Sequence, residues 1–247
     1  MNKKSNTIYF DNNWGMFVGS FNDNRFHKHY AVQLSVSIKK PVEILSEKNS
    51  VLSNGCVLIK SNVLHQLNCT TNHLVFLFNP TSQTGHYLQQ KATQSITEFK
   101  HPIINQLRSL ASRFLKGMLS FQSFIKHTKL VLGEFNCECE GNIHISDNRV
   151  YAALNYLKEK KDRVVPLNEI ASFSCLSPSR FLHLFKEKTN ITYRRAQLWN
   201  KISHSLPYLS THGITETAHQ FGFTDSAHYA KVFKENFGFT PKMVSKS

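Results

Sequence analysis

Two stretches near the end of the printed sequence place cations and hydrogen-bonding groups at helical spacing. In the first, SFSCLSPSRFLHLFKEKTNIT, one side of the expected helix carries Ser179, Arg180, His183 and Lys186. In the second, HQFGFTDSAHYAKVFKENFGFTP, the matching side carries Ser226, His228, Lys231 and Lys234. Rows of cations and short hydrogen-bonding groups with few acids are suited to contact phosphates and base edges in a DNA major groove. These residues predict recognition of a polyanion.

The two stretches are loose copies of one another. The matching pairs are Ala171 with Ala218, Cys175 with Gly222, Leu176 with Phe223, Phe181 with Tyr229 and Phe185 with Phe233. Each copy predicts a short helix, a tight turn and a second helix, whose N-cap oxygen comes from Ser177 in the first copy and Thr224 in the second. A single amphipathic hairpin would favour structural packing. Two copies in a basic segment favour two helix-turn-helix units.

The segment between the copies, ITYRRAQLWNKISHSL, predicts a helix that holds the two units apart. About 15 helical residues span about 22 Å. Two recognition helices that enter successive major grooves lie about 34 Å apart, or closer if the DNA bends. The sequence therefore predicts a stiff spacer between two DNA-reading helices.

Charge and composition narrow the class of partner. Lys and Arg number 30 against 16 Asp and Glu, which gives a formal net charge of +14. Such a charge favours nucleic acid over acidic membranes. We expect a cytoplasmic protein without a membrane partner, because the first residues lack an apolar signal segment and HLVFLF is too short to span a bilayer. The five scattered cysteines predict reduced thiols rather than a disulfide framework.

The hydrophobic pattern divides the chain into an α+β arrangement. In YAVQLSVSI, apolar residues from Val32 to Ile38 alternate with Gln33, Ser35 and Ser37, which predicts a half-buried strand. Similar runs elsewhere in the first hundred residues predict an antiparallel sandwich or barrel. Helical spacing begins near Ile103 and predicts one or two helices over 102–135, then a linker at NCECEGNIHISDN. The predicted divisions are a barrel domain at 1–98, a helical segment and linker at 99–147, and a helical domain at 148–247.

Residues from about Asn148 to Lys242 resemble the DNA-binding domain of the AraC/XylS family of bacterial transcription regulators. The resemblance rests on LSPSRFLHLFKE, RRAQLW and AHQFGFTDSAHYAKVFKENFGFTP, whose glycines, aromatic residues and caps fall at the family's spacing. Asn190 stands where the family has glycine, and it also tolerates a left-handed conformation. The resemblance implies two helix-turn-helix motifs joined by a long helix.

The first hundred residues are similar to the sensory cupin barrels of such regulators, through RFHKHYAVQL and GCVLIKSNVLHQLN. This resemblance implies a divalent-metal set at His27, His29, Gln33 and His65. Gln33 is a poorer ligand than the acid it replaces. A cavity for a small organic effector and purely structural histidines are the alternatives. The pair Cys137 and Cys139, with His144 nearby, lacks a second pair of ligands and is interpreted as part of a linker.

The sequence thus predicts a regulator of transcription that binds specific DNA sites without catalysis and needs no cofactor. Base reading is assigned to Ser179, Arg180, His183, Ser226, Ala227 and His228, and phosphate binding to Lys186, Arg194, Arg195, Lys231 and Lys234. Its partners are double-stranded DNA, RNA polymerase if it activates, a possible effector and a possible second copy. For the helices over 102–135, pairing of two subunits and capping of the barrel remain open. The rival functions are a metal-dependent cupin enzyme fused to a DNA-binding module and a nonspecific nucleic-acid binder.

Overall fold

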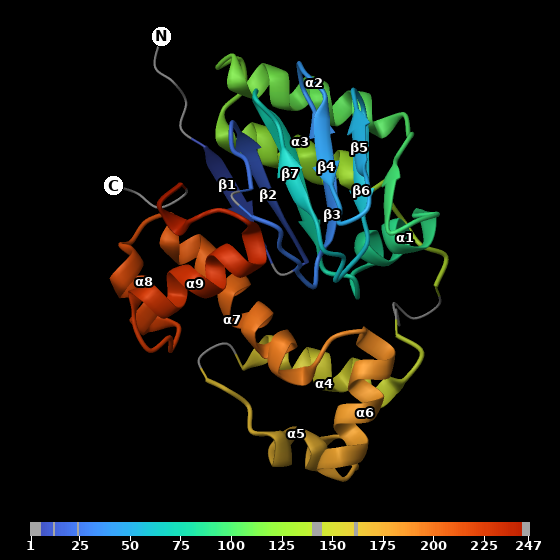
Figure 1. Ribbon diagram of the computed structural model, residues 1–247, viewed down its shortest axis with the longest axis vertical. Helices are drawn as coiled ribbons and strands as arrows, with labels where there is room; N and C mark the ends of the chain where they lie inside the picture. The colour runs from blue at the N-terminus through green and yellow to red at the C-terminus, as the bar shows by residue number, and fades with distance from the viewer. Residues whose placement is uncertain (1–5, 12, 24, 140–144, 161–162, 244–247) are drawn as a thin grey trace.

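A computed structural model describes residues 6–11, 13–23, 25–139, 145–160 and 163–243. The N-terminal part is built from two antiparallel sheets (Figure 1). A six-stranded sheet has the order β1-β2-β8-β3-β6-β9, and a three-stranded sheet has the order β5-β4-β7. The strands are β1 (Thr7–Phe10), β2 (Trp14–Gly19), β3 (Val32–Ser37), β4 (Val42–Leu45), β5 (Ser50–Ser53), β6 (Cys56–Ile59), β7 (Gln66–Asn68), β8 (His73–Phe78) and β9 (Ile96–Glu98). The predicted α+β class and antiparallel sheets are confirmed; we call this part the barrel.

Strand β3 lies between β8 and β6, where Leu34 pairs with Phe76 on one side and Leu58 on the other. All six of its residues are buried, so the expectation of a half-buried strand is wrong. Its apolar residues face the helices, while Gln33, Ser35 and Ser37 face the barrel interior and form hydrogen bonds there. A strand can bury polar side chains when they form hydrogen bonds. The alternation of apolar and polar residues in β3 therefore resembles that of a strand with one face in solvent, although both of its faces are buried.

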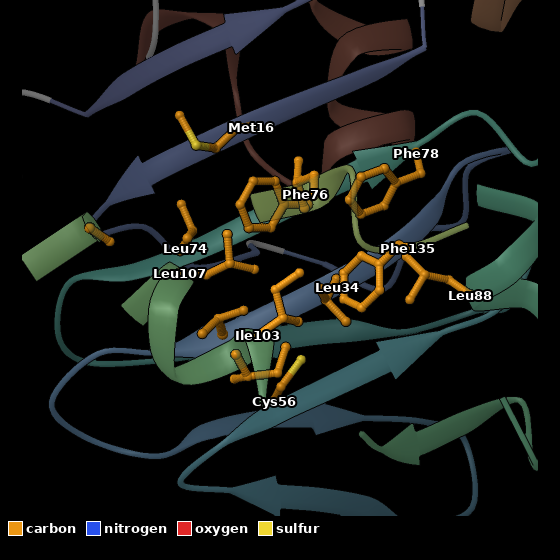
Figure 2. Packing of buried hydrophobic residues seen from close by; sticks show 14 of the residues in the cluster. Met16, Leu34, Cys56, Leu74, Phe76, Phe78, Leu88, Ile103, Leu107 and Phe135 are labelled. Carbon is orange, nitrogen blue, oxygen red and sulfur yellow. The ribbon is translucent and has the colours of Figure 1, made fainter. Parts of the chain in front are cut away.

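Three helices cover one face of the large sheet: α1 (Gln83–Lys91), α2 (Ile103–Leu115) and α3 (Phe121–Leu132). Figure 2 shows Ile103 and Leu107 of α2 packed against sheet residues such as Leu34 and Phe76. One or two helices were predicted over 102–135 and the structure has two, α2 and α3; the apolar stripe of α2 caps the barrel. The prediction that the first hundred residues contain only strands is wrong, because α1 lies within them. Its sequence SQTGHYLQQK carries a weak apolar stripe, with only Gly85 and Leu88 buried.

The C-terminal part is helical, as predicted. It comprises α4 (Asn148–Glu159), α5 (Leu167–Phe173), α6 (Pro178–Thr189), α7 (Tyr193–Leu209), α8 (Ile214–Gln220), α9 (Ser226–Phe237) and the 3₁₀ turn η2 (Pro241–Met243). The pairs α5–α6 and α8–α9 are the two predicted helix-turn-helix units, and α7 is the predicted spacer. Cys175 and Gly222 both take positive φ in the tight turns, and Asn190 ends α6 in the left-handed conformation.

The two helix-turn-helix units contact the barrel differently. The second unit, α8–α9, shares one hydrophobic cluster with the barrel, in which Phe237 and Phe239 lie against Phe17. The first unit, α5–α6, has a cluster of its own that includes only Tyr30 from the barrel. In Figure 1, α9 lies beside β1 and β2, whereas α5 and α6 lie at the end of the molecule farthest from α2. The second unit is therefore the one docked on the barrel.

No helix within the described ranges is both long and apolar enough to cross a membrane. None of the five cysteines, all of which lie in the described part of the chain, forms a disulfide.

Candidate DNA-binding surface and barrel site

Helix α6 presents the first predicted reading surface. The Ser177 hydroxyl accepts the Arg180 backbone N–H at 3.3 Å, and Pro178 occupies the first turn, so the helix start is fixed as predicted. Phe181 and Phe185 are fully buried. Their burial turns the opposite face to solvent, where the exposed residues are Ser179, Arg180, His183 and Lys186.

Helix α9 presents the second surface. Its N-cap is Asp225, whose carboxylate accepts the His228 backbone N–H at 2.7 Å; the prediction of Thr224 is wrong by one residue. A carboxylate at this position also favours the positive end of the helix dipole. The hydroxyls of Tyr229 and Ser205 lie 2.9 Å apart and join α9 to α7. Among the predicted contacts, Ala227, His228 and Lys231 are exposed, and Ser226 and Lys234 are half-buried.

The spacer helix α7 has 17 residues. Arg194 is exposed, but Arg195 is half-buried and its guanidinium donates to the Lys28 carbonyl of the barrel. Burial lowers the pKa of Arg195 from its usual value, and its Nε has no hydrogen-bond partner. In this arrangement Arg195 contacts the barrel in place of a phosphate.

A groove runs between α9 and the barrel loop that contains Arg25 and Lys28. Its cationic lining residues are Arg25, Lys28, Arg194, Arg195 and Lys231, and its single acid is Glu235. Since Lys231, Arg194 and Arg195 are predicted phosphate contacts, the barrel loop stands directly beside part of the DNA surface. We call this the cationic groove.

The four residues predicted for the barrel site lie together. His27, His29 and His65 are buried, and each offers one ring nitrogen within 4.8 Å of the others. The side-chain oxygen of Gln33 lies 3.0 Å from His29 Nε2 and 3.2 Å from His65 Nε2. His27 and His65 are joined by paired backbone hydrogen bonds at 2.9 and 3.0 Å, which hold the two predicted motifs in register.

Hydrogen positions follow from the neighbours of these rings. The carbonyls of Ala31 and Val63 accept from His29 Nδ1 and His65 Nδ1, at 3.0 and 2.9 Å. Burial lowers the pKa of His29 to about 4 and that of His65 to about 3, so both rings are neutral near pH 7. Their Nε2 atoms therefore carry lone pairs that point toward Gln33.

Two arrangements satisfy these lone pairs. In the first, the Gln33 amide is turned so that its NH₂ group donates to both rings and its oxygen accepts from the Ser35 hydroxyl, whose oxygen lies 3.0 Å from the amide. In the second, the lone pairs bind a divalent ion, and the carbonyls behind each Nδ1 orient the rings. The donor set fits both.

Asp23 extends the cluster. Its carboxylate lies 3.4 Å from His27 Nδ1 and accepts the Leu67 backbone N–H at 2.6 Å. Burial raises the pKa of Asp23 well above its usual range and lowers that of His27 well below, so removal from water disfavours both charged forms. Asp23 also lies against Gly238 at the end of α9, in the second helix-turn-helix unit. The approach is so close that a Cβ added at Gly238 would lie 2.6 Å from the Asp23 carboxyl.

The barrel mouth is closed by the C-terminal domain. The space between Asp23, Gln33 and the aromatic residues Phe21, Phe237 and Phe239 measures about 10 Å³, which is about one water molecule. Phe239 is 3% exposed, with ring centroids 5.2 Å from Phe17 and 5.5 Å from Phe21. Phe237 and Phe239 of the C-terminal domain therefore lie over the barrel histidines, beside Asp23 and Gln33.

Several residues of this region were not predicted from sequence. Asp23, Phe237, Phe239 and Trp199 contact the barrel site, and Trp199 lies 5.8 Å from His29 between ring centroids. One signal was available: the FGF run places two phenylalanines at and just beyond the end of α9. His144, named with the cysteine pair, lies outside the described residues.

Residues 170–247 match the family model described as a helix-turn-helix domain. The chain is 33% identical over 98 residues to the arabinose operon regulatory protein of Escherichia coli (strain K12), a match that covers 38% of this chain and 34% of that protein. It is 23% identical over 232 residues to the probable transcriptional regulator LumQ of Photobacterium leiognathi, covering 87% and 90%. The match thus spans about a third of the arabinose regulator's length.

Among solved structures, the chain is similar to an apo ToxT variant from Vibrio cholerae strain SCE256, with a TM-score of 0.64, 15% identity and coverage of 95% and 99%. A second ToxT structure from that strain, bound to an unsaturated fatty acid, gives a TM-score of 0.54, 16% identity and coverage of 98% and 95%. These likenesses confirm the fold of the whole chain.

Both of the sequence relatives, the arabinose operon regulatory protein and LumQ, are named as regulators. The C-terminal part of the chain is thus a helix-turn-helix domain, similar to a 98-residue part of the arabinose operon regulatory protein.

Proposed function

We propose that this protein is a sequence-specific transcriptional regulator whose access to DNA is controlled by docking of its second helix-turn-helix unit on the barrel. The observation that carries the proposal is the pair of capped helices α6 and α9. Each buries an aromatic face and turns cations toward solvent. Such helices enter the major groove in helix-turn-helix proteins.

The division of roles on α6 is tested by Arg180→Ala and Lys186→Ala. Binding sites are first selected from random DNA fragments, and the affinity of each variant is then measured on the selected site and on single-base changes. Arg180→Ala should lose about 1–3 kcal/mol of discrimination at one base pair. Lys186→Ala should weaken all sequences alike and reduce the slope of log K against log salt by about 0.9.

Two results would contradict this assignment. If both variants weakened all sequences equally, the assignment of base reading to Arg180 would be wrong. If the selection returned no consensus, the protein would be a nonspecific binder.

Docking restrains the second unit in two ways. Arg195 donates to the barrel at Lys28, and the barrel loop forms one wall of the cationic groove beside His228 and Lys231. Full engagement of DNA by this unit requires the loop to move away. The first unit keeps its reading face exposed, with Asn62 of the barrel donating to the Asn190 carbonyl at 3.0 Å.

An effector in the barrel mouth would release the second unit. The enclosed space of about 10 Å³ is too small for an organic ligand, so such a ligand needs Phe237 and Phe239 to leave. A ligand that binds only the undocked state shifts the population toward it. Long-chain carboxylic acids are the first class to test, because one ToxT structure holds an unsaturated fatty acid and the cationic groove adjoins this mouth.

Trp199 supplies the readout for this test, since its ring lies between His29 and Phe237 at centroid distances of 5.8 and 5.9 Å. In a Trp14→Phe variant it is the single tryptophan. A saturable change in its emission with oleate, together with tighter binding to the selected DNA, supports effector control. Unchanged emission and affinity over the whole titration would refute it for this ligand class.

We propose that DNA binding by α6 and α9 requires no cofactor. A divalent ion at His27, His29 and His65, with Gln33, is a separate proposal supported by the converging lone pairs. Metal analysis of untagged protein tests it. Loss of bound metal in His65→Gln supports an ion there, and less than about a tenth of an equivalent in the native protein leaves the hydrogen-bonded arrangement.

We propose further that α3 pairs two copies. Leu130 is 66% exposed on α3 in a groove with Leu110 and Val131. Leu130→Asp should convert a dimer to a monomer in sedimentation, whereas the equally exposed Leu52, at 65% on β5, provides the matched control as Leu52→Asp. We also propose that the protein contacts RNA polymerase when its operator lies beside a promoter. Because its proposed partner is chromosomal DNA, we propose that it acts in the cytoplasm.

A further inference from the structure

A second group of side chains that could hold a metal ion lies apart from the barrel histidines. His86 comes from α1, and Cys137 and Cys139 come from the segment after α3. One ligand atom from each lies within 4.8 Å of the others, and Cys139 Sγ is 3.3 Å from His86 Nδ1. Cys137 is buried, and the other two are half-buried. The linker interpretation of this cysteine pair did not include His86.

The surrounding structure holds the three residues in place without a metal. Helix α1 is anchored by Leu88, which is fully buried, and its N-cap Ser82 accepts the Gly85 N–H at 3.1 Å. Phe135 is also fully buried, and its ring stacks on Tyr87 with centroids 5.5 Å apart. These contacts lay the segment that carries both cysteines across the end of α1. A ligand set ordered in advance loses less conformational entropy on binding a metal.

The chemistry of the donors selects the ion. Two thiolates and one imidazole form a soft set that favours Zn²⁺ over Mg²⁺ or Ca²⁺. With Zn–S about 2.3 Å and Zn–N about 2.0–2.1 Å, a tetrahedral nitrogen–sulfur pair lies about 3.5 Å apart. His86 Nδ1 and Cys139 Sγ lie 3.3 Å apart, so a shift of about 0.2 Å brings them to that distance. Three protein ligands leave a fourth position for water.

We propose that His86, Cys137 and Cys139 form a Zn²⁺ site that fastens the segment after α3 to α1. This segment leads from the barrel domain toward α4, the first helix of the C-terminal part. Bound zinc therefore fixes the point from which the chain departs toward the DNA-reading units. The site is distinct from the barrel histidines, and its existence does not depend on the proposed function.

The test uses the full chain without a His tag, reduced, freed of metal with a chelator and titrated with Co²⁺ as a spectroscopic substitute for Zn²⁺. We expect thiolate-to-cobalt charge-transfer absorption that saturates at one equivalent and is abolished by stoichiometric Zn²⁺. Cys137→Ala and Cys139→Ser should each remove the absorption. The exposed Cys175→Ser is the matched thiol control and should retain it, as should His65→Gln, which alters only the barrel site.

Folding is checked in chelator by circular dichroism, where each variant should match the native protein. Hydrogen exchange should show that Zn²⁺ protects α1 and the segment after Phe135 in the native protein but not in Cys139→Ser. Absence of the absorption in reduced native protein would overturn the proposal. Persistence of the charge-transfer absorption in Cys137→Ala would also overturn the proposal. So would a native protein in which Cys137 and Cys139 form a disulfide and, once reduced, bind no cobalt.

Discussion

Replacement of Phe21 by alanine should loosen the second helix-turn-helix unit from the barrel and strengthen DNA binding. Phe21 is 6% exposed and belongs to the barrel, so the change leaves the DNA surface intact. Its ring lies 5.5 Å from Phe239, which contacts only one other barrel ring, that of Phe17 at 5.2 Å, among the described aromatic pairs. The substitution therefore removes one of the four described ring pairs that join Phe237 and Phe239 to the barrel.

The size of the effect follows from that geometry. Full burial of a phenylalanine contributes about 1.5–3 kcal/mol, and an aromatic pair adds about 0.5–1.5 kcal/mol. Because Phe21 also contacts Phe17 and His73 within the barrel, we assign about 1–2 kcal/mol of its loss to docking. That range shifts the docking equilibrium about 5- to 30-fold. If the docked form predominates, the apparent Kd for DNA falls by up to the same factor.

Fluorescence anisotropy with the selected DNA site measures this change, and Trp199 emission reports undocking in the same samples. Phe99→Ala is the matched control, since Phe99 is 8% exposed in the hydrophobic cluster on the other face of the sheet. It should lower the free energy of unfolding without changing DNA affinity. Undocking in Phe21→Ala without tighter binding would refute the idea that docking restrains DNA access.

Three further predictions concern stability, measured as the free energy of unfolding in urea. Burial lowers the pKa of His73 to about 4, so between pH 6.5 and 4 the unfolded chain binds more protons than the folded chain and the free energy of unfolding falls as the pH falls. His73→Asn should reduce the slope of the free energy of unfolding against pH by about 1.4 kcal/mol per pH unit in this range. An unchanged slope would contradict this reasoning. Gly222 and Cys175 both have positive φ, +64° and 55°, a conformation that favours glycine. Gly222→Ala should therefore lower the free energy of unfolding by about 1 kcal/mol, and Cys175→Gly should raise it by about as much. If both substitutions changed the free energy of unfolding in the same direction, this reasoning would be wrong. Asp225→Ala should lower the free energy of unfolding by about 1 kcal/mol, because Asp225 is the N-cap of α9, whereas Thr224→Ala should leave it almost unchanged. If Thr224→Ala had the larger effect, Thr224 would be the N-cap.

The C-terminal domain was predictable because its signals are local. Ser177 and Pro178 mark the start of α6, and paired aromatic residues at four-residue spacing mark the buried faces of α6 and α9. The one error there, Thr224 for Asp225, arose because both residues are good N-caps and the second copy carries an inserted residue. Local chemistry could not decide between them.

The barrel was predicted less well because its decisive contacts are not local. The serines of β3 have the alternation of an exposed strand, and only their partners across the interior reveal that they are buried. The four residues predicted from two motifs do lie together, but Asp23 and the neighbouring phenylalanines come from other parts of the chain. His86 meets Cys139 through packing of Tyr87 on Phe135, a contact that no sequence spacing encodes.

The separate core of the first helix-turn-helix unit makes the two units unequal during a search for an operator. With its reading face open while the second unit is docked, the first unit alone would sample DNA, through few phosphate contacts and with rapid dissociation. Long residence would begin only when the second unit joins it. A signal received by the barrel would then act mainly on the dissociation rate, and the lifetime of single complexes would record it more clearly than the frequency of encounters.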